Sequence, residues 1–125
     1  MHKLFLLCWS LIVSCVIAYF CLTESSNIPA VNIPSIDKIV HFCFHFGFTI
    51  SWITFFKKEL QGTDNAKAYL VSFIFSVLFG ITIEIMQGVY TTTRASDVTD
   101  VLANTLGAMF AIFMAVVFKK QLDKI

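Results

Sequence analysis

Four long apolar stretches constrain this chain more than any other feature of its sequence. Each comes close to the ~20 residues that an α-helix needs to cross the ~30 Å hydrocarbon core of a bilayer. Inside hydrocarbon, backbone N–H and C=O groups must pair within the protein, which favours helices over open strands. We therefore predict four transmembrane helices, over about residues 4–22, 36–56, 69–87 and 97–118.

The composition agrees with this interpretation. Hydrophobic residues make up 58% of the 125 positions, charged residues only 14%, and the mean hydropathy is +0.81, which argues against a soluble protein. The net charge is +1, so the charge balance does not favour nucleic acid as a partner. The spans occupy most of the chain, and we expect one all-α integral membrane domain over residues 1–125, a bundle of four transmembrane helices.

The first predicted span resembles a signal peptide in outline, because it follows the short basic start Met1-His2-Lys3. Its apolar run of about 19 residues is longer than a secretory signal requires. No small-residue cleavage pattern precedes Thr23. We therefore expect a retained helix.

Lysine and arginine positions set the expected orientation, because basic residues are retained on the cytoplasmic side of short loops. Only Lys38 and Arg94 fall on one side of the predicted spans. The other side carries seven lysines, Lys3, Lys57, Lys58, Lys67, Lys119, Lys120 and Lys124. Both termini and the loop after the second span should be cytoplasmic, in a multi-pass protein of the cytoplasmic membrane.

Polar side chains gather at the extracytoplasmic end of this topology. Ionisable residues within spans cost ~2.5–3.5 kcal/mol each on insertion scales, so they usually mark a protein-lined site. The residues are Asp37, Lys38, His41 and His45 in the second span, Glu84 and Gln87 in the third, and Arg94, Asp97, Asp100 and Asn104 around the start of the fourth. We predict that they converge on one site.

Spacing by four residues supports the prediction, because such residues share one face of a helix. Asp37, His41 and His45 follow this step. Small residues do so as well, and they let helices approach closely. The row in the third span is Ser72, Ser76 and Gly80, and Glu84 follows at the same step. The row in the fourth span is Ala103, Gly107 and Ala111. We expect the third and fourth helices to pack tightly, with acids at the outer end.

Several kinds of chemistry fit these residues. His41 with Glu84 or Asp100 can transfer protons, which makes these three the candidate catalytic residues. Arg94 is the expected cation beside Glu84. A metal held by His41 and His45 with carboxylates is an alternative, but histidines at i and i+4 often occur by chance, so we assign no metal and no cofactor. No Ser, Cys or Lys arrangement identifies a nucleophile.

Capping, snorkelling or interhelical hydrogen bonding also explains polar residues near helix ends, and we favour this interpretation for Lys38 and Asp97. Cys8, Cys15, Cys21 and Cys43 show no CxxC spacing and are interpreted as small hydrophobic residues. A disulfide between Cys21 and Cys43 is the alternative, since both would lie near the extracytoplasmic surface.

Two segments resemble the VanZ-like family of bacterial membrane proteins. Residues 37–47 read DKIVHFCFHFG, similar to the DKxxHFxxF opening of a helix in that family. Residues 84–87 read EIMQ, and the residues after them complete a pattern similar to the family's ExxQ…R…D…DxxxNxxG; they are Arg94, Asp97, Asp100, Asn104 and Gly107. Together the two segments cover about residues 35–111.

The resemblance implies a compact helical membrane domain, in a family whose founding member is associated with resistance to the glycopeptide teicoplanin. It implies no known reaction. The matching positions are Asp37, His41, Glu84, Gln87, Arg94, Asp97, Asp100, Asn104 and Gly107. Two departures bear on loop shape and packing: Thr91-Thr92-Thr93 lacks the proline often found before the arginine, and Ala111 replaces a second glycine.

Two functions fit these observations. In the first, the protein binds or modifies an anionic headgroup or lipid-linked envelope precursor at the extracytoplasmic face. Membrane lipids would then be its partners, and the candidate binding residues are Arg94, Asp37, Gln87 and Asn104. In the alternative, the protein is a non-enzymatic structural or accessory component whose buried charges fix helix packing. Ion conduction fits less well, because no chain of ionisable residues reaches the cytoplasmic half.

Overall fold

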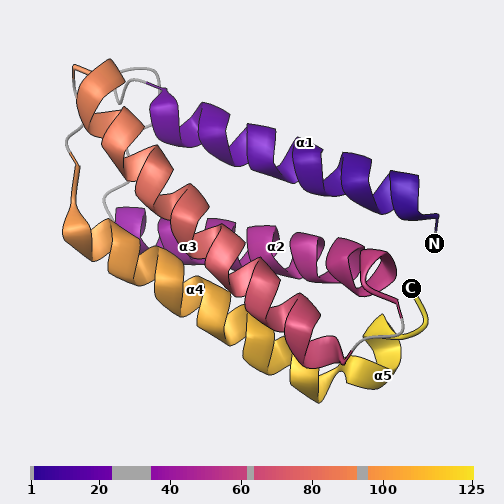
Figure 1. The fold of residues 1–125 in the computed structure, drawn as a ribbon. Helices are drawn as coiled ribbons and strands as arrows, with labels where there is room; N and C mark the ends of the chain where they lie inside the picture. The colour runs from indigo at the N-terminus through magenta and orange to yellow at the C-terminus, as the bar shows by residue number, and fades with distance from the viewer. Residues whose placement is uncertain (1, 24–34, 62–63, 93–95) are drawn as a thin grey trace.

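The protein is a bundle of long helices, described here from a computed structural model over residues 2–23, 35–61, 64–92 and 96–125 (Figure 1). The helices are α1 (Lys3–Leu22), α2 (Ile36–Glu59), α3 (Asn65–Tyr90) and α4 (Val98–Val117), followed by the short α5 (Lys119–Leu122). All four long helices have the length and apolar composition to cross a membrane. The predicted all-α bundle of four transmembrane helices is confirmed.

The helix ends follow from local capping. The helix α3 begins at Asn65, four residues before the predicted span, because the Asp64 carboxylate caps it by accepting a hydrogen bond from the Ala66 N–H at 3.3 Å. Asp97 caps α4 by accepting from the Thr99 N–H at 2.9 Å. Ser35 occupies the N-cap of α2, where it adopts a left-handed φ of 57° and makes no side-chain cap hydrogen bond.

The helix α2 lies at the centre of the bundle and contacts α1, α3 and α4, and its largest interface is with α4. Figure 1 shows α1 and α4 on opposite sides, and both termini together with α5 at one end. The start of α2, the end of α3 and the start of α4 lie at the other end. The polar residues predicted to converge therefore belong to one end of the bundle.

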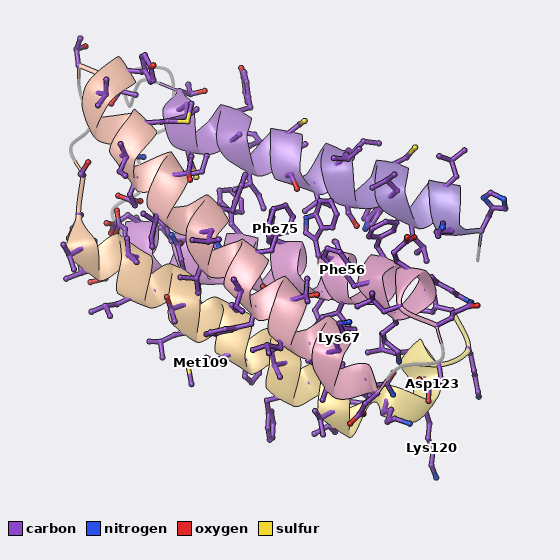
Figure 2. All side chains as sticks on the ribbon, in the orientation of Figure 1. Phe56, Lys67, Phe75, Met109, Lys120 and Asp123 are labelled. Carbon is purple, nitrogen blue, oxygen red and sulfur yellow. The ribbon has the colours of Figure 1, made fainter. Side chains whose placement is uncertain are left out.

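Aromatic rings fill the bundle away from that end. Phe48 is fully buried and stacks on Phe79, with ring centroids 4.5 Å apart, and Trp52 meets Phe75 edge-on at 4.7 Å. Figure 2 shows Phe75 in the space between α1 and α3. Large apolar side chains elsewhere on the helices are exposed, as expected of surfaces that face lipid. Cys21 and Cys43 both belong to the described residues, and no disulfide joins them.

Small residues allow close approach, although the partner helix differs in part from the one expected. Gly107 on α4 faces the backbone of Phe42 on α2, so this part of the row packs against α2 rather than α3. On α3, Gly80 leaves room for the side chains of His45 and Asn104. The interface between α3 and α4 exists as predicted. At the polar end, His41 of α2 contacts both Glu84 of α3 and Asp100 of α4.

The end that carries both termini has its own ion pairs. Lys57 and Lys119 contact the Asp123 carboxylate at 2.5 and 3.2 Å, and Lys3 contacts Glu59 at 2.8 Å. Figure 2 shows Lys120 and Asp123 together at this end. The Lys57 ammonium, followed by that of Lys119, holds the pKa of Asp123 below its ordinary value. These contacts join the ends of three helices and the C-terminal segment.

Candidate functional site

His41 lies where α2, α3 and α4 meet, at the end of the bundle away from the termini. Its Nε2 is 3.5 Å from Asp100 Oδ2, and its Nδ1 is 3.8 Å from Glu84 Oε1 and 3.1 Å from Asn104 Oδ1. His41, Glu84 and Asp100 are 2%, 3% and 5% exposed, so an imidazole and two carboxylates share a site that is almost closed to solvent. We call these four residues, His41, Glu84, Asp100 and Asn104, the His41 cluster.

Helical spacing explains how the cluster forms. Asp100 and Asn104 are one turn apart on the face of α4 that packs on α2, where His41 lies. Glu84 comes from the last two turns of α3. The convergence of His41, Glu84, Asp100 and Asn104 predicted from the sequence is therefore present in the structure, and each of the three helices contributes at least one side chain.

Lys38 contacts three carboxylates of the site, although the sequence favoured a capping or snorkelling role for it. Its Nζ donates to Asp37 Oδ2 at 2.9 Å, to Asp97 Oδ2 at 2.8 Å and to Asp100 Oδ1. The Lys38 ammonium, ahead of the Thr99 hydroxyl and N–H, holds the pKa of Asp97 well below its usual range. The sequence could have indicated this role, because Lys38 and Arg94 are the two basic residues at the end of the predicted topology where the acids gather.

Glu84 is held by the segment that leads into α4. Its Oε2 accepts from the Asp97 N–H at 3.2 Å, and its backbone carbonyl accepts from the Ser96 hydroxyl at 2.7 Å. Gly88 makes this contact possible, since a Cβ there would overlap Ser96 Oγ. Glu84 Oε1 is buried and has no hydrogen-bond partner among the described residues. Ser96 and Gly88 were not predicted as parts of the site, because their roles depend on a contact between α3 and the residue before Asp97.

Three other candidates occupy different positions. Gln87 donates from Nε2 to the Cys21 carbonyl at 2.7 Å, so its side chain joins α3 to α1 instead of meeting His41. Asp37 is half exposed and contacts Lys38. Arg94 lies outside the described residues, as do residues 24–34 between α1 and α2.

His45 shares the face of His41, as predicted, but has different partners. Its Nδ1 is 2.9 Å from Ser76 Oγ, deeper in the bundle. The atoms that converge within 4.8 Å as possible metal ligands instead come from His41, Glu84 and Asp100. A second such group, of Asp37, Asp97 and Asp100, surrounds Lys38.

The fold and this geometry define a polytopic α-helical membrane protein with a buried imidazole–carboxylate cluster at one end of its bundle. A family model described as VanZ/LLP1 matches residues 4–119, nearly the whole chain. The chain belongs to this family, which confirms the resemblance seen in its motifs and extends it to α1. No curated protein and no solved structure matches the chain.

Proposed function

We propose that this chain is a multi-pass protein of the bacterial cytoplasmic membrane that binds and modifies an anionic headgroup at the extracytoplasmic face. The headgroup would belong to a phospholipid or a lipid-linked envelope precursor. One observation carries the proposal: His41 is held between the carboxylates of Glu84 and Asp100 in a nearly closed site at the rim of the bundle. These three side chains are the groups that would act on the bound headgroup.

The placement of the site supports a lipid substrate. The lysine count assigns the end with both termini to the cytoplasm, and the His41 cluster belongs to the opposite end (Figure 1). A headgroup of the outer leaflet would reach this rim while its acyl chains stay against the exposed apolar surfaces of the helices. The association of the family's founding member with teicoplanin resistance would then follow from a change in the envelope.

Charge sets a requirement for this function. Around His41 the described residues place the carboxylates of Asp37, Glu84, Asp97 and Asp100 against the single ammonium of Lys38. An anion would be repelled unless more positive charge were present. Arg94, which follows Glu84 in the motif, is the residue proposed to supply it. Asn104, with a buried amide nitrogen that has no partner among the described residues, would donate to the headgroup.

Lipid binding by the purified protein tests the proposal. Phosphatidylglycerol should raise the unfolding temperature of the protein in neutral detergent more than phosphatidylcholine does, and Arg94→Gln should remove most of the difference. Asp123→Asn, at the other end of the bundle, is the matched control and should keep it. Equal stabilisation by both lipids would contradict binding of an anionic headgroup.

Modification is tested in cells. Lipid and envelope-precursor profiles should differ between cells with and without the protein, and Glu84→Gln and Asp100→Asn should produce the profile of cells without it. Both variant proteins must be present at wild-type level in the membrane. An unchanged profile in cells without the protein would contradict the modification step.

A structural role is the second candidate, because the same charges also join helices. Lys38 connects α2 to Asp97 and Asp100, and Glu84 accepts from the backbone of Asp97. In this role, Glu84→Gln and His41→Ala would lower the free energy of unfolding. Any change in the lipid and envelope-precursor profile would then follow from a smaller amount of folded protein. Variants that fold normally but give the profile of cells without the protein would instead support the headgroup function.

A further inference from the structure

The His41 cluster brings three groups of electron-pair donors together, one imidazole and two carboxylates. Asn104 Oδ1 lies 3.1 Å from Nδ1 of His41, and because an amide oxygen only accepts, a hydrogen bond between them places a proton on Nδ1. In the neutral imidazole the lone pair is then on Nε2, which lies 3.5 Å from Asp100 Oδ2. Glu84 Oε1 is buried on the same site and has no hydrogen-bond partner among the described residues. These buried donors repel one another unless a proton or a metal cation lies among them.

We propose that His41, Glu84 and Asp100 together bind one divalent metal cation. The possible ligand atoms of the three residues lie within 4.8 Å of one another. Two ligands of one ion are at most about 4.4 Å apart, twice a metal–ligand distance of ~2.0–2.2 Å, so small side-chain rotations close the site. One imidazole nitrogen with two carboxylates suits Zn²⁺ or Mn²⁺ better than Ca²⁺.

The surroundings already resemble the outer shell of a metal site. A ligating histidine usually donates its other ring N–H to a carbonyl or carboxylate, which fixes the tautomer, and Asn104 Oδ1 has this position. Lys38 contacts Oδ1 of Asp100, so Oδ2 of the same carboxylate stays available. The Asp97 N–H likewise occupies Glu84 Oε2 and leaves Oε1 available. Each carboxylate therefore has one oxygen held and one oxygen directed at the site.

The cation would also meet the charge requirement stated above. It adds two positive charges to a region where carboxylates outnumber the lysine. An ion with three protein ligands keeps open positions, and a phosphate oxygen of a headgroup would occupy one. This last step rests on the proposed function. With the ion bound, His41 is a ligand rather than a proton carrier, and the metal supplies the interaction with the anion.

Metal retention by the full-length protein tests the inference. The protein, purified in detergent and stripped with EDTA, is loaded with Mn²⁺, desalted and measured for bound Mn²⁺ per chain. We expect one ion per chain, with a ¹⁴N coupling from His41 in the electron spin-echo spectrum. Glu84→Gln and Asp100→Asn, which keep the shape of the side chains, should lose the ion, and Asp123→Asn should retain it.

The Mn²⁺ affinity of Lys38→Met distinguishes a metal site from a charge network with only a structural role. Removal of the ammonium beside Asp100 should raise the affinity for Mn²⁺ several-fold, because a competing cation is lost. A structural role predicts weaker binding or none. Absence of a retained ion in the wild-type protein, retention by both carboxylate variants, or weaker binding by Lys38→Met would each overturn the inference.

The two proposals fail separately. A protein that retains Mn²⁺ but does not distinguish phosphatidylglycerol from phosphatidylcholine would support the metal site and contradict the headgroup function. Lipid discrimination by a protein that retains no Mn²⁺ after loading would support the headgroup function and overturn the metal site.

Discussion

Gly107 of α4 lies directly against the backbone carbonyl of Phe42 on α2. A Cβ at position 107 would overlap that oxygen and come within 3.1 Å of the Phe42 Cα, so the two backbones touch at this point. The contact lies about one helical turn from Asn104 on α4, and Phe42 directly follows His41 on α2. Close approach of these backbones therefore sets how near the side chains of the His41 cluster come to one another.

Gly107→Ala should destabilise the protein by about 1–3 kcal/mol, because the backbone of α2 must move to admit a methyl group. The measurement is the free energy of unfolding in detergent. Gly47→Ala is the matched control, since nothing lies within 4 Å of a Cβ there. That variant should be neutral or more stable by up to ~1 kcal/mol, because alanine favours a helix. Equal effects of the two substitutions would contradict the close contact.

Ser76→Ala should lower the free energy of unfolding by about 1–2 kcal/mol, because it leaves the Nδ1 of buried His45 without its partner. Ser72 lies one turn earlier on α3, equally buried, and its hydroxyl has no partner among the described residues. Ser72→Ala should therefore change stability little or increase it. The reverse order of the two effects would show that the His45–Ser76 hydrogen bond is not formed.

Asp123 should make stability depend on pH. Its pKa is lowered in the folded protein by Lys57 and then by Lys119, so the paired carboxylate stabilises the fold above the unfolded pKa of about 3.8. The stabilisation is lost as the pH falls through the depressed folded value. Asp123→Asn should therefore be less stable than wild type at neutral pH, and the difference should disappear in strong acid. Because Asp123 is exposed, high salt should also reduce the difference. A pH-independent difference would contradict the ion pairs.

Accessibility to reagents tests the orientation of the bundle. In a background without the four native cysteines, Thr92→Cys in intact cells should react with a membrane-impermeant maleimide, and Lys67→Cys should react only after lysis. Both positions are exposed, so reactivity reports the side of the membrane. The opposite pattern would place the His41 cluster at the cytoplasmic face and contradict the headgroup proposal.

The sequence by itself determined the number of helices and the end of the bundle that is polar. A bilayer imposes a length on each span, so four apolar stretches of that length predict four helices. Their polar residues had to lie near one another along the membrane normal, because each span places them at the same depth. Asp97 as a helix cap was also readable, since capping depends on residues close in the chain.

Tertiary structure decided which of these residues meet. Spacing places Gln87 and Glu84 about one turn apart on α3, yet Gln87 donates to α1 and Glu84 approaches His41. Lys38 contacts three carboxylates, one beside it at the start of α2 and two at the start of α4. These contacts depend on how each helix is rotated about its axis and on its height beside its neighbours. The residue spacing within one helix carries no information on either quantity, because both are set by the packing of side chains from different helices.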